Sequence, residues 1–273
     1  MTGLSSDMST HDPVPLRASL ERDGYAIGKA MVPVELIAAV RAFWHQELST
    51  PRPDSALIWG PYFGEPNKVI RDSATTHTMV RAFDMLWNPP MHAPTRELCL
   101  TLSRFRNEVA GIFSHDSELM TPERYGAYVT ATLYPPGEGW LVEHEDGVPN
   151  RRHWHFLVPL TFRGPDFKDG GLFMIDRHGT RIDVEEHVQA GDVLFFDANL
   201  RHGVDRIIGH DGSDVGRMQC FSIPTILELP HTNDRLLELI STKRFVKSRL
   251  RMIRDRLFGK PTNPHRGFYT YRK

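Results

Sequence analysis

The chain has 273 residues, with 33 basic and 34 acidic side chains and a formal net charge of −1. This length suits one large domain, or a domain with extensions, and the even balance of charge gives no global field that would attract nucleic acid or a membrane surface. The two cysteines, Cys99 and Cys220, lie far apart within apolar segments, so we expect no disulfide framework and a reducing interior. The sequence shows neither a signal peptide nor an apolar run of membrane-spanning length, and we expect a cytoplasmic protein.

The N-terminal part predicts a polar lead-in followed by helices and one strand. Residues 1–15 are polar with two prolines and are expected to be disordered. Residues 16–22 suit a short helix and residues 23–32 a strand. Pro33 then opens a helix whose apolar residues recur every three or four positions, a stripe suited to packing.

The next stretch, residues 49–75, is rich in Pro, Gly and Asn and is expected to be loop with short strands. Loops of this kind carry binding residues in many enzymes. Trp59, Tyr62 and Arg71 are therefore candidates for substrate contacts, and ordinary loop packing is the alternative. A helix follows at about 94–114, with apolar residues at helical spacing that predict packing against a sheet.

From Tyr125 the hydrophobic period changes from helical to two, which is typical of strands. Strands are predicted, with turn residues between them, at 127–134, 140–146, 154–162, 170–176, 181–184, 192–197, 203–208 and 217–224. Eight short strands preceded by helices predict an α+β fold, a double-sheet jelly roll with a helical layer on one face. Pro159 lacks a backbone donor, so a bulge or an edge is expected there.

After Pro230 the pattern is helical again, over about 232–258. Its second half carries eight basic residues against one acidic residue, Asp255. A solvated basic face is the ordinary interpretation, and contact with nucleic acid or an acidic partner is the alternative. An apolar stripe on the same helix is suited to docking on the domain or on a second subunit. We therefore expect residues 231–273 to form a basic helical extension that can support a homo-oligomer.

The segment YVTATLYPPGEGWLVEHED ends in His144 and Asp146, two potential metal ligands separated by one residue. Side chains alternate faces along a strand, so both should point to one side together with Trp140 and Val142, with Leu141 pointing away. An imidazole and a carboxylate, joined by a distant second histidine, form the facial site of non-haem Fe(II) oxygenases. The histidine in VLFFDANLRHGV, at position 202, fits that third position.

Further motifs surround this pair in order. Tyr134 stands ten residues before His144, and GGLFMI at 170–175, VQAGDVLFFDANLRHGV at 188–204 and GRMQCFSIP at 216–224 follow. This order resembles the Fe(II)/2-oxoglutarate-dependent dioxygenases, and the spacing from Tyr134 to Asp146 is most similar to their prolyl-hydroxylase-like branch. The resemblance covers about residues 120–225. It implies a double-stranded β-helix core within a domain at residues 16–230.

The resemblance also implies the ligands of the site. The metal ligands would be His144, Asp146 and His202, which hold Fe(II) and leave positions for a bidentate 2-oxo acid and O2. The far carboxylate of 2-oxoglutarate needs an arginine, whose planar fork forms two parallel hydrogen bonds. We assign Arg217 to this role, with residues 209–216 as a lengthened turn. Arg206 is the alternative.

Neighbouring strand positions supply further candidates for the cosubstrate. By the resemblance, Tyr134 donates its hydroxyl to the same carboxylate, and a core tyrosine is the alternative. Gln219 shares the face of Arg217 by the period of two and is a second candidate. Thr130 and Thr132 are expected on the inner face of their strand.

His153 and His155 form an HxH pair of the kind that cupin metal sites use. No glutamate follows at a matching short spacing, and Arg151 and Arg152 precede the pair. These four residues are therefore predicted to face the substrate or to be structural.

Together these features predict an oxygenase that hydroxylates a C–H bond of a polar small molecule, such as an amino acid or an intermediate of a specialised metabolite, with release of succinate and CO2. Halogenating relatives have a small residue where Asp146 stands, so a halogenase is not expected. Two alternatives are a prolyl-hydroxylase-like protein modifier and a non-catalytic jelly-roll module that binds through the basic helix. Membrane and nucleic-acid partners are not expected.

Overall fold

The computed structural model describes residues 11–49, 68–74, 78–86, 92–111, 127–146 and 154–224. The helices in these ranges are α2 (Pro13–Arg22), α3 (Val34–Leu48), α4 (Ala93–Ala110) and the 3-10 turn η2 (Val184–Glu186). The strands are β1 (Tyr25–Gly28), β2 (Lys68–Ala74), β3 (Thr78–Leu86), β4 (Ala127–Tyr134), β5 (Trp140–His144), β6 (Trp154–Pro159), β7 (Phe167–Ile175), β8 (Arg181–Asp183), β9 (Val193–Asp197), β10 (His202–Gly209) and β11 (Arg217–Pro224).

All three predicted N-terminal helices are present, with changed ends. Helix α2 begins at Pro13, inside the predicted disordered lead-in, because the Asp12 side chain accepts a hydrogen bond from the Val14 amide and proline favours the first turn. Helix α4 ends at Ala110 rather than at 114, because Gly111 adopts a left-handed conformation with φ of +75°. The predictions for residues 231–273 lie outside the described residues.

The eight strands predicted after Tyr125 are all present. Strand β2 lies within residues 49–75, where short strands were expected, and the structure adds β3, which pairs with β2, β4 and β5. Pro159 is the last residue of β6 and lies beyond the last residue paired with β9, Leu157, so its missing donor leaves that pairing intact. The expected bulge or edge is therefore wrong, because β6 lies between β9 and β11 and Pro159, at the end of the strand, is paired with Gln219 on β11.

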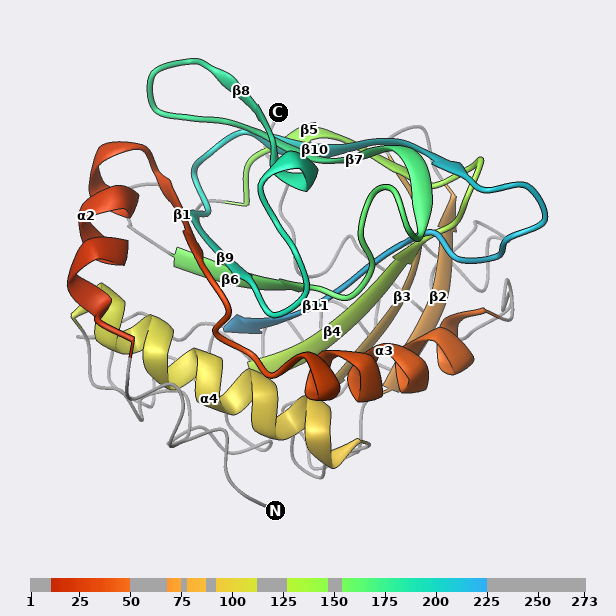
Figure 1. The fold of residues 1–273 in the computed structure, drawn as a ribbon, viewed down its shortest axis with the longest axis horizontal. Coiled ribbons are helices and arrows are strands. Elements are labelled where there is room, and N and C mark those ends of the chain that lie inside the picture. The colour runs from red at the N-terminus through yellow and green to blue at the C-terminus, as the bar shows by residue number, and fades with distance from the viewer. Residues whose placement is uncertain are drawn as a thin grey trace, which may run out of the picture.

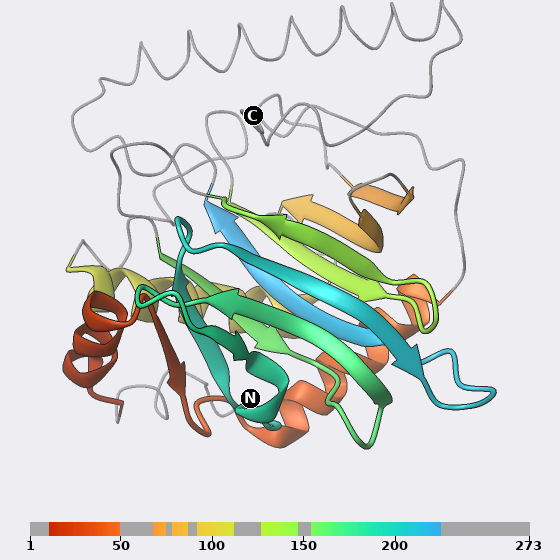
Figure 2. The ribbon, with the colours of Figure 1, turned by 90° about the horizontal axis from the view of Figure 1, so that it is seen from above.

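The strands form an antiparallel array in the order β1-β9-β6-β11-β4-β3-β5-β10-β7-β8, and β2 pairs with β3. This array folds into two layers. Helices α3 and α4 lie against the outer face of the layer that contains β6, β11, β4 and β3, and β5, β10 and β7 form the opposite layer (Figure 1). Seen from above, β10 lies between β7 and β5 (Figure 2). The α+β jelly roll with a helical layer is confirmed.

Two hydrophobic cores lie on opposite faces of the helix-bearing layer. The helix-side core joins α3 and α4 to residues such as Phe156, Phe195 and Met218. The inner core lies between the layers and includes Leu157 and Phe196. Neighbours in one strand, such as Phe156 and Leu157, therefore serve different cores, as the strand period requires.

Both cysteines lie in the helix-side core, where they are free and fully buried. A hydrogen bond with the Cys220 thiol, together with burial, raises the pKa of Cys99. The fold thus brings together two thiols that the sequence separates widely.

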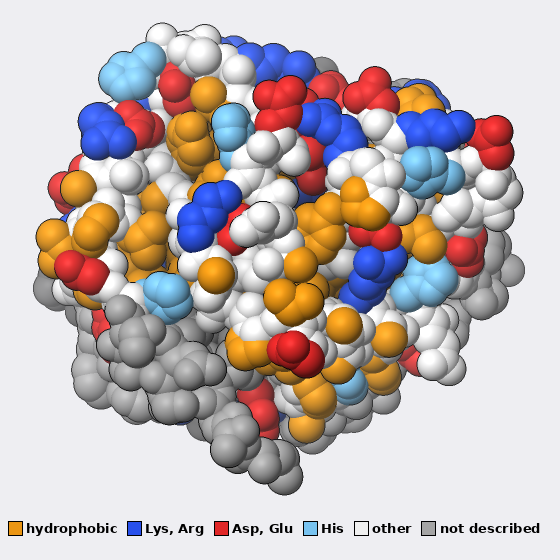
Figure 3. Space-filling view, viewed as in Figure 1, with side chains coloured by type: hydrophobic (Ala, Val, Ile, Leu, Met, Phe, Trp, Pro, Cys, Tyr) orange, Lys and Arg blue, Asp and Glu red, His pale blue; other side chains and the backbone are white. Residues whose placement is uncertain are grey.

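On the face in Figure 3, basic side chains lie beside acidic ones, in keeping with the even charge balance. Ion pairs such as Arg163 with Asp183 (2.6 Å) and Arg181 with Asp205 (2.7 Å) are of this kind. Among the helices in the described ranges, none has the length and apolarity to cross a bilayer.

Candidate active site

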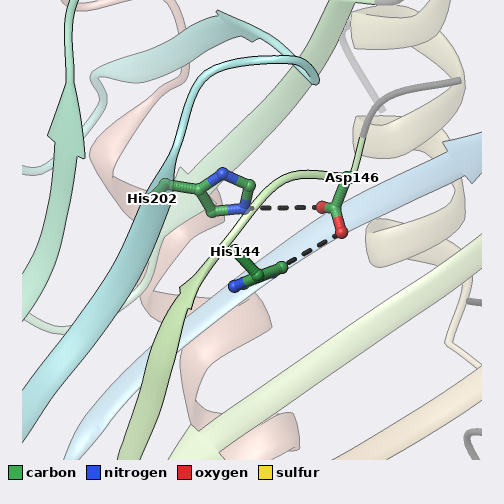
Figure 4. Close-up of side chains that lie close together, drawn as sticks. All are labelled: His144, Asp146 and His202. Atoms are coloured by element: carbon green, nitrogen blue, oxygen red, sulfur yellow. Dashed lines mark ion pairs between the residues drawn. The ribbon is translucent and has the colours of Figure 1, made fainter. Parts of the chain in front are cut away.

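The three predicted metal ligands come together at the ends of two paired strands (Figure 4). His144 ends β5, His202 begins β10, and the two are direct partners in the ladder. Asp146 follows β5 by two residues, and its backbone amide donates to the Ala198 carbonyl at 2.9 Å. One ligand atom of each residue lies within 4.8 Å of the others. The sequence-predicted triad is therefore one compact group.

Backbone carbonyls fix the orientation of both imidazoles. Nδ1 of His144 lies 2.8 Å from the Val142 carbonyl, and Nδ1 of His202 lies 2.9 Å from the Leu200 carbonyl. Because a carbonyl only accepts, Nδ1 is the donor in each contact, and Nε2 of each ring is left facing the site. Both Nε2 atoms face Asp146, at 3.5 Å from His144 and 3.4 Å from His202. Such second contacts are typical of histidines that bind metals.

The electrostatics of this group favour a cation. Burial opposes ionisation of Asp146, but hydrogen bonds from His144 and His202 hold the pKa of its carboxyl well below the usual range. Burial likewise lowers the pKa of His144, yet the hydrogen bond and charge of Asp146 outweigh it, so the net pKa is raised. Two imidazoles that point at one ionised carboxylate are a suitable setting for a cation.

One detail of the predicted strand is wrong. Between the pairs His202–His144 and Val204–Leu141, β5 has one residue more than β10, so β5 contains a bulge. Leu141 consequently packs against the inner core, on the side of His144, while Val142 is exposed. Strict alternation had placed Leu141 and Val142 the other way round.

His155 also reaches the metal ligands. It lies on β6, its Nε2 is 4.0 Å from Oδ2 of Asp146, and its ring packs against Phe196 at 5.3 Å. Phe196 in turn contacts the ring of His202 at 5.1 Å. His155 therefore lines the site beside the triad. The other predicted substrate residues, Trp59, Arg151, Arg152 and His153, lie outside the described residues.

Arg217 is buried on the inner face of β11, directly opposite Tyr134 in the β4–β11 ladder. Its Nε donates to Oε1 of Glu185, and its Nη1 donates to Oε1 of Gln219. Its Nη2 has no hydrogen-bond partner among the described residues. Gln219 is thus confirmed as a neighbour of Arg217 on this face.

The alternative arginine, Arg206, does not face this pocket. It is exposed on β10, and its Nη1 donates to the Gly137 carbonyl at 3.1 Å. Strand β10 ends at Gly209 and β11 begins at Arg217, so the intervening residues form the lengthened turn that the sequence predicted.

Unsatisfied polar atoms gather near Arg217. Thr130 and Thr132 are buried on β4, their hydroxyls lack hydrogen-bond partners within the described ranges, and Thr132 is directly opposite Gln219. Buried polar groups are normally satisfied, because an unpaired one costs free energy. The free Nη2 and the two hydroxyls therefore fit a polar ligand, and the arginine fits a carboxylate.

Glu185 belongs to this pocket and was missed at the sequence level. It lies on η2, its side chain is fully buried, and Oε1 also accepts a hydrogen bond from the Leu172 amide at 2.9 Å. Gly171 makes room for it, because a Cβ there would lie 2.3 Å from Cγ of Glu185. The adjacent pair Glu185–Glu186 looks like an exposed acidic turn in sequence, and the glycine pair in GGLFMI was the available signal.

Comparisons with known proteins bear on the fold. No protein-family model matches the sequence, and no curated protein matches it. A crystal structure of a Pseudomonas putida prolyl-4-hydroxylase matches with a TM-score of 0.53 and 15% identity, over 77% of this chain and 97% of that one. The non-heme alpha-ketoglutarate-dependent carbocyclase SnoK from nogalamycin biosynthesis matches with a TM-score of 0.52 and 15% identity, over 80% of this chain and 86% of that one.

These similarities identify the class of fold. The chain has the double-stranded β-helix fold of the 2-oxoglutarate-dependent oxygenases, and a group of two histidines and one aspartate stands on its inner face. The predicted resemblance is confirmed at the level of the fold and of the ligand group.

Proposed function

We propose that this protein is an Fe(II)- and 2-oxoglutarate-dependent oxygenase. The observation that carries the proposal is the convergence of two imidazole nitrogens and one carboxylate oxygen within 4.8 Å. Two imidazoles and a carboxylate are the ligand set of non-haem Fe(II) oxygenases. When bound, Fe(II) together with 2-oxoglutarate and O2 supplies the oxidising chemistry, with succinate and CO2 as products.

The residues of the chain hold and orient the reactants. His144, Asp146 and His202 would bind the metal, with the carbonyls behind both imidazoles keeping Nε2 turned toward it. Arg217 would bind the far carboxylate of 2-oxoglutarate through Nη2, the nitrogen that lacks a partner in the described structure.

Neighbours of Arg217 complete this pocket. Tyr134 is its direct partner in the β4–β11 ladder and is buried in the inner core, and Thr132 faces Gln219. Their hydroxyl and amide groups would satisfy the remaining carboxylate oxygens. Burial of these groups excludes water, which strengthens each contact with the cosubstrate.

For the substrate we propose a polar small molecule that is hydroxylated at a C–H bond. His155 supports a polar substrate, because its imidazole lies beside the metal ligands and is not one of them. Asp146 occupies the position that must be vacant for a halide, which supports hydroxylation rather than halogenation. We also propose that residues 16–230 form the catalytic domain and that residues 231–273 extend it.

A substrate screen that reports succinate release tests this function. Polar amino acids, metabolite intermediates and proline-containing peptides would be incubated with the protein, Fe(II), 2-oxoglutarate and O2 in chloride buffer. Mass spectrometry would then give the masses of the products. A product heavier by one oxygen supports the proposal. A chlorinated product contradicts hydroxylation, a product lighter by two hydrogens assigns desaturation or ring closure, and turnover of the peptides alone assigns a protein modifier.

A further inference from the structure

Arg217 is paired with a carboxylate inside the pocket that would receive another carboxylate. Its Nε donates to Oε1 of Glu185, and both side chains are almost completely inaccessible to solvent. The formal charges of the two groups cancel. An incoming anion therefore meets a neutral pair, whereas an arginine with neutral partners would present a full positive charge.

The fold is built around Glu185. The Asp183 side chain accepts a hydrogen bond from the Glu185 amide at 3.0 Å. This contact fixes the turn from which the Glu185 side chain points inward. Gly171, at φ of +127°, leaves the space that Cγ of Glu185 fills. The next amide, that of Leu172, donates to the same Oε1 that accepts from Arg217. This backbone contact fixes Oε1 and, through it, the plane of the guanidinium group.

The second oxygen of Glu185 has no hydrogen-bond partner within the described residues. The nearby Arg163 has carboxylates of its own, at 2.6 Å to Asp183 and 3.7 Å to Glu186. Glu185 thus keeps one oxygen without a hydrogen-bond donor among the described residues, in a carboxylate that lies beside the guanidinium group. A carboxylate placed there repels a second carboxylate that binds to the same arginine.

We propose that Glu185 is a positioning residue for Arg217 that sets both the direction and the net charge of the cosubstrate pocket. This inference rests on the proposed function, because the anion is taken to be 2-oxoglutarate. Glu185 directs Nη2 toward the ligand through its hydrogen bond to Nε. At the same time its charge keeps the affinity for the dicarboxylate below the value that Arg217 would give beside a neutral partner.

Two substitutions separate direction from charge. Glu185→Gln keeps an oxygen that accepts from Nε and from the Leu172 amide, and removes the charge. Glu185→Asp keeps the charge, but its side chain is shorter by one methylene group, so the carboxylate lies farther from Nε of Arg217. Glu186→Gln is the matched control, because it removes the same charge from the exposed neighbour of Glu185.

The measurement is anaerobic calorimetric titration of Fe(II)-loaded protein with two 2-oxo acids. One is 2-oxoglutarate, and the other is 2-oxopentanoate, which has a methyl group in place of the far carboxylate. The ratio of the two affinities reports the far carboxylate alone, because any general damage to the metal site affects both ligands. Thermal unfolding checks that each variant is folded.

We expect Glu185→Gln to bind 2-oxoglutarate roughly tenfold more tightly and 2-oxopentanoate as the wild type does. Glu185→Asp should weaken 2-oxoglutarate binding about tenfold, again with 2-oxopentanoate unchanged, and Glu186→Gln should match the wild type. An unchanged ratio in Glu185→Gln and Glu185→Asp overturns the inference while the proposed function stands. Wild-type protein that binds Fe(II) but neither 2-oxo acid overturns both.

Discussion

Successive residues of β11 point to opposite faces of the strand, and the two faces carry different kinds of side chain. Met218 and Cys220 point into the helix-side core, which is apolar and closed by α3 and α4. Arg217 and Gln219 point between the two layers, where Nη2 of Arg217 has no hydrogen-bond partner among the described residues. One strand thus contributes to stability on one face and to binding on the other.

Polar groups behave differently on the two faces. In the helix-side core the Thr95 hydroxyl accepts a hydrogen bond from Nε1 of Trp44 at 2.9 Å. On the inner face Thr132 is buried as well, but its hydroxyl has no partner among the described residues. A satisfied hydroxyl stabilises the folded chain, and an unsatisfied one costs free energy until a ligand binds. The inner face is therefore prepared for a ligand at the expense of stability.

The largest effect is expected at the metal ligands. His144→Ala, Asp146→Ala and His202→Ala should each weaken Fe(II) binding by more than about a hundredfold, since loss of an outer contact alone costs roughly tenfold to a hundredfold. Circular dichroism should stay unchanged, because the helix-side core does not include these residues. His178→Ala, at an exposed histidine, is the control. A variant that keeps wild-type Fe(II) affinity would remove that residue from the ligand set.

A mutation in the helix-side core should have the opposite pattern of effects, with stability lowered and metal binding kept. Leu98 is fully buried there, so Leu98→Ala should lower the free energy of unfolding by about 2–5 kcal/mol through lost burial and a cavity. Chemical denaturation measures this change. The Fe(II) stoichiometry of the folded fraction should remain at the wild-type value, and a parallel loss of metal would show that the two faces are not independent.

A smaller effect, on the affinity for 2-oxoglutarate, is expected at Arg217. Arg217→Lys keeps the charge but loses the planar fork, so 2-oxoglutarate binding should weaken about tenfold with little change in Fe(II) affinity. Arg206→Lys is the matched control, because Arg206 is exposed on the neighbouring layer. If the control shows the weakened binding and Arg217→Lys does not, the cosubstrate pocket has been assigned to the wrong strand.

The smallest effect compares two threonines, and its sign is the informative part. Thr132→Val removes an unsatisfied hydroxyl and should raise the free energy of unfolding by up to about 1 kcal/mol. Thr95→Val breaks the hydrogen bond to Trp44 and should lower it by about 1 kcal/mol. If denaturant titrations gave changes in the free energy of unfolding with the same sign for both variants, the proposed difference between the two faces would be contradicted.

Local patterns predicted much of this protein. The eight strands after Tyr125 followed from the period of two, and the position of Arg217 followed from treating residues 209–216 as a turn. The triad followed from the HxD pair and a distant histidine together with the family resemblance that the surrounding motifs carry.

Other features depend on contacts that the sequence does not reveal. The bulge in β5 exists because of its pairing with β10, so strict alternation misplaced Leu141. Glu185 becomes part of the pocket only because Gly171, on another strand, admits its side chain. The contact between Cys99 and Cys220 likewise requires α4 to lie against β11. Each of these is a tertiary contact between segments distant in sequence.

An anaerobic titration with Fe(II) and then 2-oxoglutarate tests the central claim most directly. The account predicts one Fe(II) per chain, followed by a weak visible charge-transfer band that saturates at one 2-oxoglutarate per chain. The band should be absent in Asp146→Ala and should need more 2-oxoglutarate in Arg217→Lys. Wild-type protein that is folded, yet binds no Fe(II) or gives no band with 2-oxoglutarate, would contradict the assignment and leave a jelly roll with another function.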